Sequence, residues 1–486
     1  MTTTMQILRN AGVLVAAVAS LANAQQPPST TQMVLKGKAP VSKEVLKVKM
    51  PRPGRATLAN GLEIMVLEDH RTPQVTFQLV IPGAGGYFDP TNGLGTASFV
   101  AAIMREGTTT RSSAQISEAL ETMGASLNVG AGAASTTAQV SGSALTPSFP
   151  ALFDLAADML LHPAFPADEV NRYRSRTKGS LIQVRANPDF LATERLDELV
   201  FGAHPASRLL ASAASLDAAT PQSLADFYKS HYVPDHAMIA FAGDITLAQA
   251  RSMVESRLGA WPKANVAKPA TQDPPPIQGA KVVLISRPNS VQTTMYIGTQ
   301  ALARTSTDYT SLLVANRVLG GVMGRLFRHL REEKGYTYGI GSGFASAPYV
   351  SAWNASTSVR TDVTDPALHD LLAEIALMRD TPVPQQELED SKRALVASFA
   401  LSLESPQQML SYYIDSWTYN LPATYWDDYP ARISAVTAAD AQAAARKYWD
   451  ASRLQIVAVG DVAKVRPILE KIGPVAVYDA DGKPIP

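Results

Sequence analysis

Cysteine is absent from this chain of 486 residues, and its absence excludes several kinds of chemistry. Without thiols the chain forms no disulfide, offers no thiolate nucleophile and holds no metal through sulfur. An excess of charge is absent as well: Lys plus Arg and Asp plus Glu each number 43, so no overall field favours nucleic acid. Stability must therefore come from hydrophobic cores, and a chain of this length predicts two or more domains.

Long apolar runs are also scarce, since no uninterrupted stretch reaches about 18 residues, the length that predicts a membrane-spanning helix. Near the N-terminus, Arg9 precedes an apolar run over 11–21, and Ala22-Asn23-Ala24 supplies the small residues of a cleavage site. This pattern predicts a signal peptide over 1–24 rather than a membrane anchor, because the run is about half as long as a span. We therefore expect an exported, periplasmic protein without a membrane span.

Proline marks a boundary near the middle of the chain. Three consecutive prolines, Pro274 to Pro276, can continue neither a helix nor a central strand, so 266–279 is expected to be a stiff extended linker. The linker separates a first domain at 51–265 from a second domain at 280–486. Residues 25–50, rich in Pro and polar residues, are expected to form a loose lead-in.

The two halves end in the same order of features, which predicts an internal duplication. Each has a helix ending in an aromatic residue, a short turn, an apolar strand and then Gly-Asp, at Gly243-Asp244 and Gly460-Asp461. In both halves the Asp is expected to cap the next helix. Strands are expected at 75–82, 281–286 and 292–299, and helices at 110–123 (capped by Ser112 or Ser113), 147–161, 168–184 and 385–403. The mixture predicts an α+β fold of two homologous α/β-roll halves, each a mostly antiparallel sheet packed with helices.

Segments in both halves carry a family resemblance. In the first half they are Gly83-Ala-Gly-Gly-Tyr87, the stretch from Gly95 to Thr108, and Glu121 to Asn128; in the second half the segment is Leu319 to Tyr338. Through these segments the chain resembles the pitrilysin/insulinase metallopeptidases, and the resemblance covers nearly the whole chain after the predicted signal. It implies a role in cutting peptides, as the type of subunit that lacks zinc.

Active members of this family carry an inverted zinc motif, H-x-x-E-H, on the helix before the Gly-Thr pair. Two His four residues apart share the zinc on one helical face, and the Glu takes a proton from the bound water. Here the three positions, counted back from Gly107, are Ser98, Ala101 and Ala102, and none can serve. The family's third ligand is a Glu expected within 171–184, which contains no acidic residue. The resemblance thus implies that this chain binds no cofactor and that zinc belongs to a partner subunit.

The remaining candidates for catalytic chemistry are weak. His231 with His236, and His329 with Glu332, offer two ligands each, so solvated or core-edge histidines are the preferred interpretation. The glycine clusters at 83–86 and 130–132 match no phosphate or dinucleotide loop, and no G-x-S-x-G elbow occurs. The second cluster is expected to form a flexible turn or a strand close to a neighbouring backbone.

In the resembled family, subunits without zinc supply an Arg and a Tyr to the active site of the pair, and these match Arg331 and Tyr338. Gly335 is expected to end the helix, leaving Arg331 in its last turns and Tyr338 on the strand beyond. Both side chains are donors that could stabilise the oxyanion formed when a peptide bond is attacked. From the residues alone, Arg331 could equally be an exposed charge beside Glu332, and Tyr338 a strand aromatic packed on the core.

Two functions therefore stay open. The first is the non-zinc subunit of a heterodimeric zinc metallo-endopeptidase, whose partner is a homologous chain bearing H-x-x-E-H and whose substrate is a peptide. The second is a non-catalytic scaffold or peptide-binding subunit of the same fold. An extended peptide is expected to pair with a sheet edge in either case. Retention of both Arg331 and Tyr338 favours the first function, because a pure scaffold has no reason to keep the pair.

Overall fold

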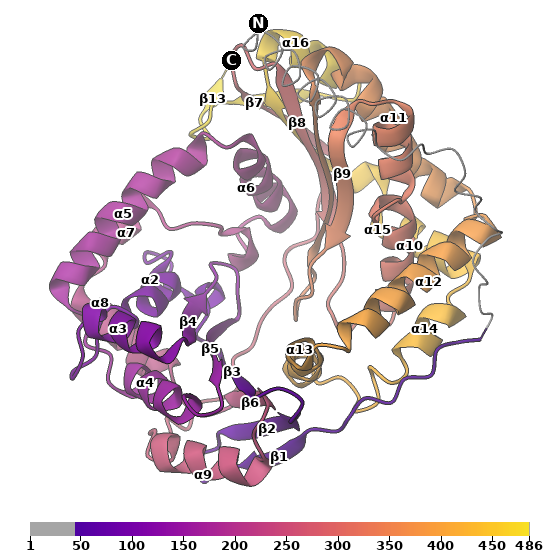
Figure 1. Ribbon diagram of the computed structural model, residues 1–486. Helices are drawn as coiled ribbons and strands as arrows, with labels where there is room; N and C mark the ends of the chain where they lie inside the picture. The colour runs from indigo at the N-terminus through magenta and orange to yellow at the C-terminus, as the bar shows by residue number, and fades with distance from the viewer. Residues whose placement is uncertain (1–43, 486) are drawn as a thin grey trace, which may run out of the picture. The chain divides into compact units, whose positions relative to one another are not determined.

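Two β-sheets, one in each half of the chain, organise the structure (Figure 1). The computed structural model describes residues 44–485, so the predicted signal peptide at 1–24 and most of the predicted lead-in lie outside the described residues. Within the described part of the chain, no helix is both long enough and apolar enough to span a bilayer.

The first sheet is built from residues 54–243. Its strands are β1 (Gly54–Thr57), β2 (Glu63–Glu68), β3 (Gln74–Pro82), β4 (Ser126–Ala131), β5 (Thr137–Leu145) and β6 (Met238–Gly243). They lie in the order β1-β2-β6-β3-β5-β4, with β2 parallel to β6 and the other neighbours antiparallel. Every residue of β6 is buried, as expected of a central strand covered on both faces.

The second sheet is built from residues 281–485. Its strands are β7 (Lys281–Ser286), β8 (Gln292–Gln300), β9 (Thr337–Phe344), β10 (Ala352–Arg360), β11 (Gln455–Gly460), β12 (Val475–Tyr478) and β13 (Pro484–Ile485). They lie in the order β13-β12-β7-β11-β8-β10-β9. Strand β7 runs parallel to β11 and β12, and the remaining pairs are antiparallel.

The same five-strand arrangement occurs in both sheets. The order β2-β6-β3-β5-β4 in the first corresponds to β7-β11-β8-β10-β9 in the second. In each set the first pair is parallel and the following three pairs are antiparallel. This shared topology confirms the predicted α+β fold of two homologous halves.

Helices flank both sheets. In the first half they are α2 (Thr96–Ile103), α3 (Ser113–Met123), α4 (Phe149–Leu161), α5 (Ala167–Arg185), α6 (Pro188–Phe201), α7 (Ala213–Ala218), α8 (Pro221–His231) and α9 (Leu247–Leu258). In the second they are α10 (Tyr309–Gly320), the π-helix η4 (Phe327–Glu333), α11 (Thr364–Asp380), α12 (Gln385–Ser402), α13 (Pro406–Thr418), α14 (Tyr429–Ala435), α15 (Ala438–Tyr448) and α16 (Val462–Leu469). Each strand and helix that the sequence predicted is present, with ends shifted by at most three residues.

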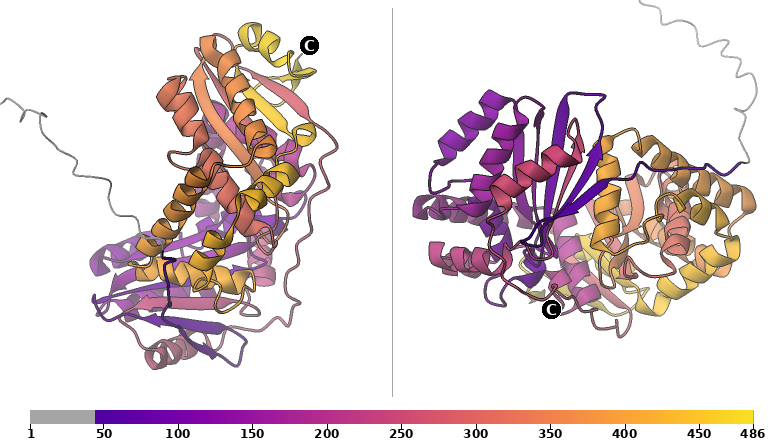
Figure 2. Two further views of the ribbon diagram at one scale, coloured as in Figure 1. Left: turned by 90° about the vertical axis from the view of Figure 1, so that its right-hand side faces the viewer. Right: turned by 90° about the horizontal axis from the view of Figure 1, so that it is seen from below.

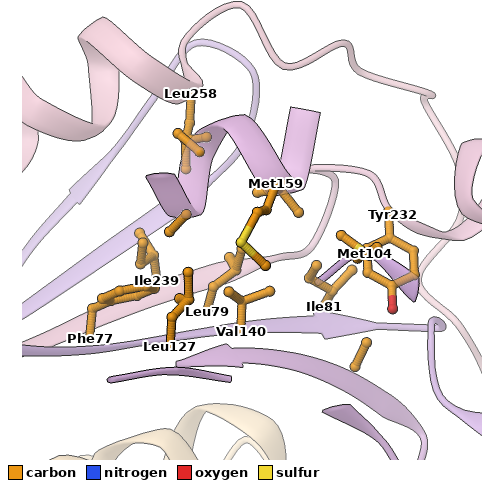
Figure 3. Packing of buried hydrophobic residues seen from close by; sticks show 14 of the residues in the cluster. Phe77, Leu79, Ile81, Met104, Leu127, Val140, Met159, Tyr232, Ile239 and Leu258 are labelled. Atoms are coloured by element: carbon orange, nitrogen blue, oxygen red, sulfur yellow. The ribbon is translucent and has the colours of Figure 1, made fainter. Parts of the chain in front are cut away.

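One face of the first sheet packs on helices of its own half (Figure 3). Alternate residues of β3, Phe77, Leu79 and Ile81, point to this face and meet Met159 of α4. All four are at most 3% exposed. The period-2 pattern of apolar residues along β3 therefore fixes which face of the strand is inside.

The other face of each sheet is covered by a helix from the opposite half. Helix α6 of the first half lies on β8 and β11, and its Leu196 belongs to a cluster with Val283 and Val457. Helix α13 of the second half lies on β6, and its Leu410 belongs to a cluster with Met238. Each half thus contributes one helix that packs on the sheet of the other half, and we call α6 and α13 the exchanged helices.

The proline-rich linker carries no helix or strand between α9 and β7, as predicted, and it is tied to both halves (Figure 2). In the first half, His204 Nε2 lies 2.8 Å from the carbonyl oxygen of Gln272, and the amide of Gln272 donates to the Tyr87 hydroxyl at 3.1 Å. In the second half, the amide of Val350 donates to Asp273 at 2.8 Å. These bonds anchor the linker along its length.

The expected Asp caps are right in one half and wrong in the other. Asp461 caps α16, accepting from the amide of Ala463 at 3.0 Å. Helix α9 instead begins after Thr246, whose side chain forms a capping box with Gln249. Two extra residues follow the Gly-Asp pair there, so Asp244 is left outside the helix and lies 2.6 Å from His70 Nδ1.

Candidate active site

Ser98, Ala101 and Ala102, which the resemblance predicts to match the zinc motif, lie on α2. The helix begins after Gly95, and the carboxylate of Asp89 accepts from the amides of Gly95 at 2.6 Å and Ala97 at 2.8 Å. Burial raises the pKa of Asp89 to about 6 despite these bonds. The hydroxyl of Ser98 donates to the carbonyl of Ala131 at the end of β4, at 2.5 Å.

The environment of α2 does not fit zinc. Ala101, at the position of the catalytic Glu, is 1% exposed and belongs to the core, while Ala102 is half-buried. Helix α5 packs across α2, with the rings of Phe99 and Tyr173 4.5 Å apart. Where the third ligand is expected, α5 carries the cations Arg172, Arg174, Arg176 and Lys178 and no acid. Across residues 44–485, no three His, Cys, Asp or Glu side chains are grouped to hold a metal.

The histidine pairs have other partners. His231 Nδ1 lies 2.7 Å from the carbonyl oxygen of Gly83, and burial lowers the pKa of this histidine. His236 lies 3.1 Å from the carbonyl of Val266. His329 is a partly exposed histidine, in keeping with the preferred interpretation, and its Nδ1 lies 2.9 Å from Glu374 on α11 rather than beside Glu332. The π-helical turn of η4 directs His329 toward α11, which an α-helical i, i+3 spacing does not anticipate.

The second glycine cluster has the expected form: Gly130 lies on β4, and Gly132 begins a turn, its carbonyl accepting from the amide of Gly86 at 3.0 Å. A Cβ at Gly85 would lie 2.1 Å from the carbonyl oxygen of Ser135, and one at Gly86 would lie 2.5 Å from that of Ala133. Gly130, on β4, has open space where a Cβ would be. The two clusters therefore approach each other closely: the first lies against the turn that follows the second.

Arg331 and Tyr338 lie side by side in the second half. Helix η4 ends at Glu333, Gly335 turns the chain with φ 62°, and β9 begins at Thr337, as the sequence predicted. The guanidinium carbon of Arg331 lies 4.5 Å from the ring centroid of Phe327 and 5.5 Å from that of Tyr338. Phe327 thus supports the Arg331 side chain next to the phenol ring.

The exposure of the two side chains separates the interpretations left open by the sequence. Tyr338 is 91% exposed, so it is not a strand aromatic packed on the core. Arg331 keeps 35% of its side chain exposed and forms an ion pair with Glu332 at 3.5 Å. Tyr336, two residues earlier than Tyr338, is half-buried against the core. An exposed phenol beside a supported guanidinium presents two donors to solvent.

Strand β9 has a feature that the sequence analysis missed. It is an edge strand, paired only with β10, and it carries Gly339, Gly341 and Gly343 at alternate positions directly after Tyr338. A Cβ at Gly339 or Gly343 would meet nothing within 4 Å. The carbonyl of Ser342 accepts from Asn316 at 3.1 Å, whereas around Gly339 another backbone can approach the edge closely. The period-2 glycines in the sequence are the signal that could have found it.

A second exposed surface follows β5 of the first half. Three hollows of about 300, 370 and 270 Å³ share Gln139, and the residues lining the latter two are all uncharged. Asp415 of α13 is the one charged side chain in the first, and burial raises its pKa. Apart from that carboxyl, the hollows offer neutral hydroxyl and amide groups, including Asn128 and Ser141.

Comparisons with known proteins agree with these features. The family model described as Insulinase (Peptidase family M16) matches residues 64–214, and that described as Peptidase M16 inactive domain matches residues 218–395. Uncharacterized zinc proteases of Bacillus subtilis and Streptomyces coelicolor are 25% and 26% identical to this chain. Those alignments cover 74% and 86% of this chain, and 86% and 89% of the two relatives.

Solved structures share the fold. The crystal structure of a peptidase M16 inactive domain from Pseudomonas fluorescens superposes with a TM-score of 0.78 at 25% identity, covering 85% of this chain and 98% of that one. A protease from Helicobacter pylori also gives a TM-score of 0.78, at 16% identity, covering 85% of this chain and all (100%) of that chain. The duplicated architecture is thus found in both.

Proposed function

This chain belongs to the insulinase (M16) peptidase family, and on that premise we propose that it is the non-zinc subunit of a heterodimeric zinc metallo-endopeptidase. The observation that carries the proposal is the exposed Tyr338, 91% accessible, with Arg331 held beside it. A phenol exposed in this way offers another molecule both an apolar ring and a hydrogen-bonding hydroxyl, the combination that makes Tyr frequent at interfaces. The curated relatives are named zinc proteases, whereas this chain has Ser98, Ala101 and Ala102 at the zinc-motif positions.

The residues present indicate which catalytic groups each subunit would supply. A homologous partner bearing H-x-x-E-H would supply the zinc and the activated water, because the residues around α2 of this chain do not fit a metal. Tyr338 would donate its hydroxyl, and Arg331 its planar guanidinium, to the carbonyl oxygen of the scissile bond as that oxygen gains negative charge. The ion pair with Glu332 leaves most donors of Arg331 free, since it joins one Nη atom at 3.5 Å.

The open edge of β9 supports a binding mode for the peptide. An extended peptide that added to this edge would run past Tyr338, and the alternate glycines leave room for its backbone. Main-chain hydrogen bonds would supply the affinity. The neutral hollows along β5 would accept polar segments of the same peptide, so this chain's share of recognition would depend little on charge.

The second function, a scaffold or peptide-binding subunit without catalytic groups, is favoured by one observation only. The Arg331–Glu332 ion pair is what an ordinary exposed helix charge would form. A scaffold would still use the β9 edge and the neutral hollows to hold peptides. Unlike the first function, a scaffold role would not depend on the hydroxyl group of Tyr338 as a hydrogen-bond donor.

Co-expression tests the proposal. The chain, with its own predicted signal, is produced with an exported homologue that carries H-x-x-E-H, and periplasmic extracts are fractionated by size exclusion. We expect the two to co-elute, with an interface on the order of 2,000 Å² or more, and the pair to cleave peptides that neither chain cleaves alone. Co-elution without gain of activity would support the scaffold instead. Separate elution at micromolar concentration would contradict the heterodimer.

A further inference from the structure

A cavity of about 840 Å³ lies in the second half and is lined by neither Arg331 nor Tyr338. Its walls come from the end of α10, the loop over 321–324, one face of η4, and parts of α11 and α12. Phe327 and Arg331, on the same helix η4, do not line it. This volume is within the range of small-molecule sites and would hold two or three amino-acid residues.

Guanidinium groups in the cavity are only partly matched by carboxylates. Arg325 and Arg328 share a single partner, Glu387, and Arg325 pairs with both of its carboxylate oxygens. The Arg325 side chain is 9% exposed, and its Nη1 has no hydrogen-bond partner. Arg317 forms no side-chain hydrogen bond or ion pair with any residue that the structure describes. Within residues 44–485, Arg317 is therefore an unpaired cation on the cavity wall, and an anionic group beside it would be stabilised.

Carboxylates on another wall are also left without partners. Glu374 of α11 contacts His329 through Oε1, but its buried Oε2 has no hydrogen-bond partner. Glu333, at the end of η4, lines the cavity and makes no ion pair with any described residue. Arg317 and Glu333, which have opposite charges and no ion-pair partner among the described residues, thus line one space. A ligand that carries a carboxylate and an ammonium would satisfy both.

Apolar side chains complete the lining. Val318 and Leu377 belong to the walls, and Val322 and Met323 form a loop at the rim with 75% and 59% of their surfaces exposed. Met323 has φ 64°, a conformation that costs a non-glycine residue about 1 kcal/mol or more. Exposed apolar residues on a strained loop beside a polar cavity are typical of a binding site.

We propose that this cavity binds short peptides of two or three residues with both termini free. Their carboxylate lies at Arg317, their ammonium lies near Glu333 and Glu374, and apolar side chains pack on Val322 and Leu377. The proposal is independent of the proposed peptidase role, because it concerns binding to this chain alone. Failure of one leaves the other standing.

Calorimetric titration of the full mature chain tests the proposal with three matched ligands: Leu-Leu, N-acetyl-Leu-Leu and Leu-Leu-amide. We expect Leu-Leu to bind, and each blocked peptide to bind about 10- to 100-fold more weakly, the loss expected from removing one charge-assisted hydrogen bond. Equal affinity for all three, or no binding at concentrations on the order of 10 mM, would overturn the proposal. Loss on amidation alone would also overturn it, because it would show recognition of a carboxylate and not of both termini.

Two variants assign the ends of the ligand. Arg317→Gln is expected to weaken Leu-Leu about tenfold while leaving the already weak Leu-Leu-amide unchanged. Glu374→Gln, which keeps the shape of the side chain, is expected to show the reciprocal pattern with N-acetyl-Leu-Leu. Arg466→Gln, on α16 and paired with Glu470 at 2.9 Å, serves as the control that changes charge outside the cavity. If Arg317→Gln and Arg466→Gln behave alike in proteins with the same unfolding midpoint, the assignment is wrong.

Discussion

Tyr338 and Tyr336 are two residues apart on one segment but meet different surroundings. Tyr338 is 91% exposed and lies beside the Arg331 guanidinium, whereas Tyr336 is half-buried against the core. Comparing the two tyrosines therefore tests whether the hydroxyl group of Tyr338 has a catalytic role. Removing a hydroxyl group keeps the ring and its packing, so only the donor is lost.

In the reconstituted heterodimer, Tyr338→Phe is expected to lower kcat by about 100- to 1,000-fold with little change in KM, as expected for a lost oxyanion donor. Arg331→Lys keeps the charge but loses the planar fork, so a severe loss in kcat is expected there too. Steady-state kinetics on one peptide measure both effects. Tyr336→Phe is expected to be nearly silent. If Tyr338→Phe and Tyr336→Phe behave alike in an intact pair, the catalytic role is refuted.

The zinc-motif positions lead to a prediction about metal. The mature chain is expected to retain no stoichiometric zinc after dialysis, and the triple variant Ser98→His, Ala101→Glu, Ala102→His is expected to remain a poor zinc binder. Ala101 is 1% exposed, so a glutamate there would be buried, and α5 has no acidic residue over 171–184 to act as the third ligand. Metal analysis by mass spectrometry decides the matter. About one zinc per chain in either protein would contradict this interpretation.

Individual residues also show where sequence patterns stop being sufficient. The helix end at Gly335 and the strand position of Tyr338 were predicted, because a glycine C-cap is a local signal. The partner of His329 was not, because a π-helical turn changes the direction in which each side chain points. The exposure of Tyr338 was open for a similar reason: an edge strand is identified only once its neighbours are known.

Among the elements, β9 combines an unpaired edge with glycines at every second position. Edges of this kind favour pairing with another chain, and proteins usually block them. At Gly339 a side chain would meet nothing within 4 Å, so the strand does not need glycine for its own packing. The open edge is therefore better explained by an approaching peptide than by the fold.

Gly339→Val is expected to raise KM in the reconstituted heterodimer several-fold or more while kcat changes little. The branched side chain suits a strand and fills empty space in the free chain, but it obstructs a peptide backbone that pairs with β9. Steady-state kinetics separate this effect from that of Tyr338→Phe, which acts on kcat. Unchanged KM in a variant with an unchanged unfolding midpoint would show that the peptide does not use this edge.

Helix α6 carries a carboxyl group with an unusual environment. Asp197 is half-buried, makes no hydrogen bond or ion pair with another described residue, and burial raises its pKa to about 7. Its unfolded pKa is near 3.8. Because the folded pKa is the higher one, the folded state binds the proton more tightly, and stability is lost as pH rises from about 4 to about 7.

Asp197→Asn removes this titration, so the variant is expected to be more stable than the natural chain above pH 7, by about 1–3 kcal/mol, with the difference vanishing near pH 4. Denaturant unfolding of both proteins across this range measures the difference. Asp89 and Asp415, whose pKa values are also raised by burial, contribute equally to both proteins and cancel. Asp226→Asn, an exposed position on α8, is the control. A stability difference that does not change with pH would contradict the assignment.

At the scale of the whole chain, the duplication was visible in the sequence because Gly-Asp after a buried strand recurs at Gly243 and Gly460. The exchange of helices was not visible. A local pattern shows that a helix has an apolar face, but not which sheet that face covers. Both exchanged helices follow a long helix and begin at an Asn-Pro or Ser-Pro pair, Asn187-Pro188 and Ser405-Pro406, which is the shared signal that could have related them.

The exchanged helices make the two halves depend on each other, and this leads to a prediction about folding. Leu196 of α6 is 1% exposed against the second sheet, where a Cβ at Gly298 would lie 2.8 Å from it, so β8 is shaped to receive the helix. Without the first half, Val283 and Val457 lose that cover, and the apolar face of α13 has no sheet to pack on.

Residues 280–486 expressed alone are therefore expected to be insoluble or unfolded, and co-expression with residues 46–279 is expected to recover a soluble complex.

In the intact chain, Leu196→Ala is expected to lower the free energy of unfolding by about 2–4 kcal/mol and to lower the stability of both halves together, because the helix belongs to one half and packs on the other. Unfolding followed by circular dichroism and by tryptophan fluorescence, to which four of the five tryptophans contribute from the second half, should give coincident transitions. A stable, monomeric second half, or two separate transitions of which Leu196→Ala shifts only one, would show that the linker joins independent domains. The exchange instead predicts a single cooperative unit, in which the β9 edge and the Arg331–Tyr338 pair keep their geometry only while α6 is in place.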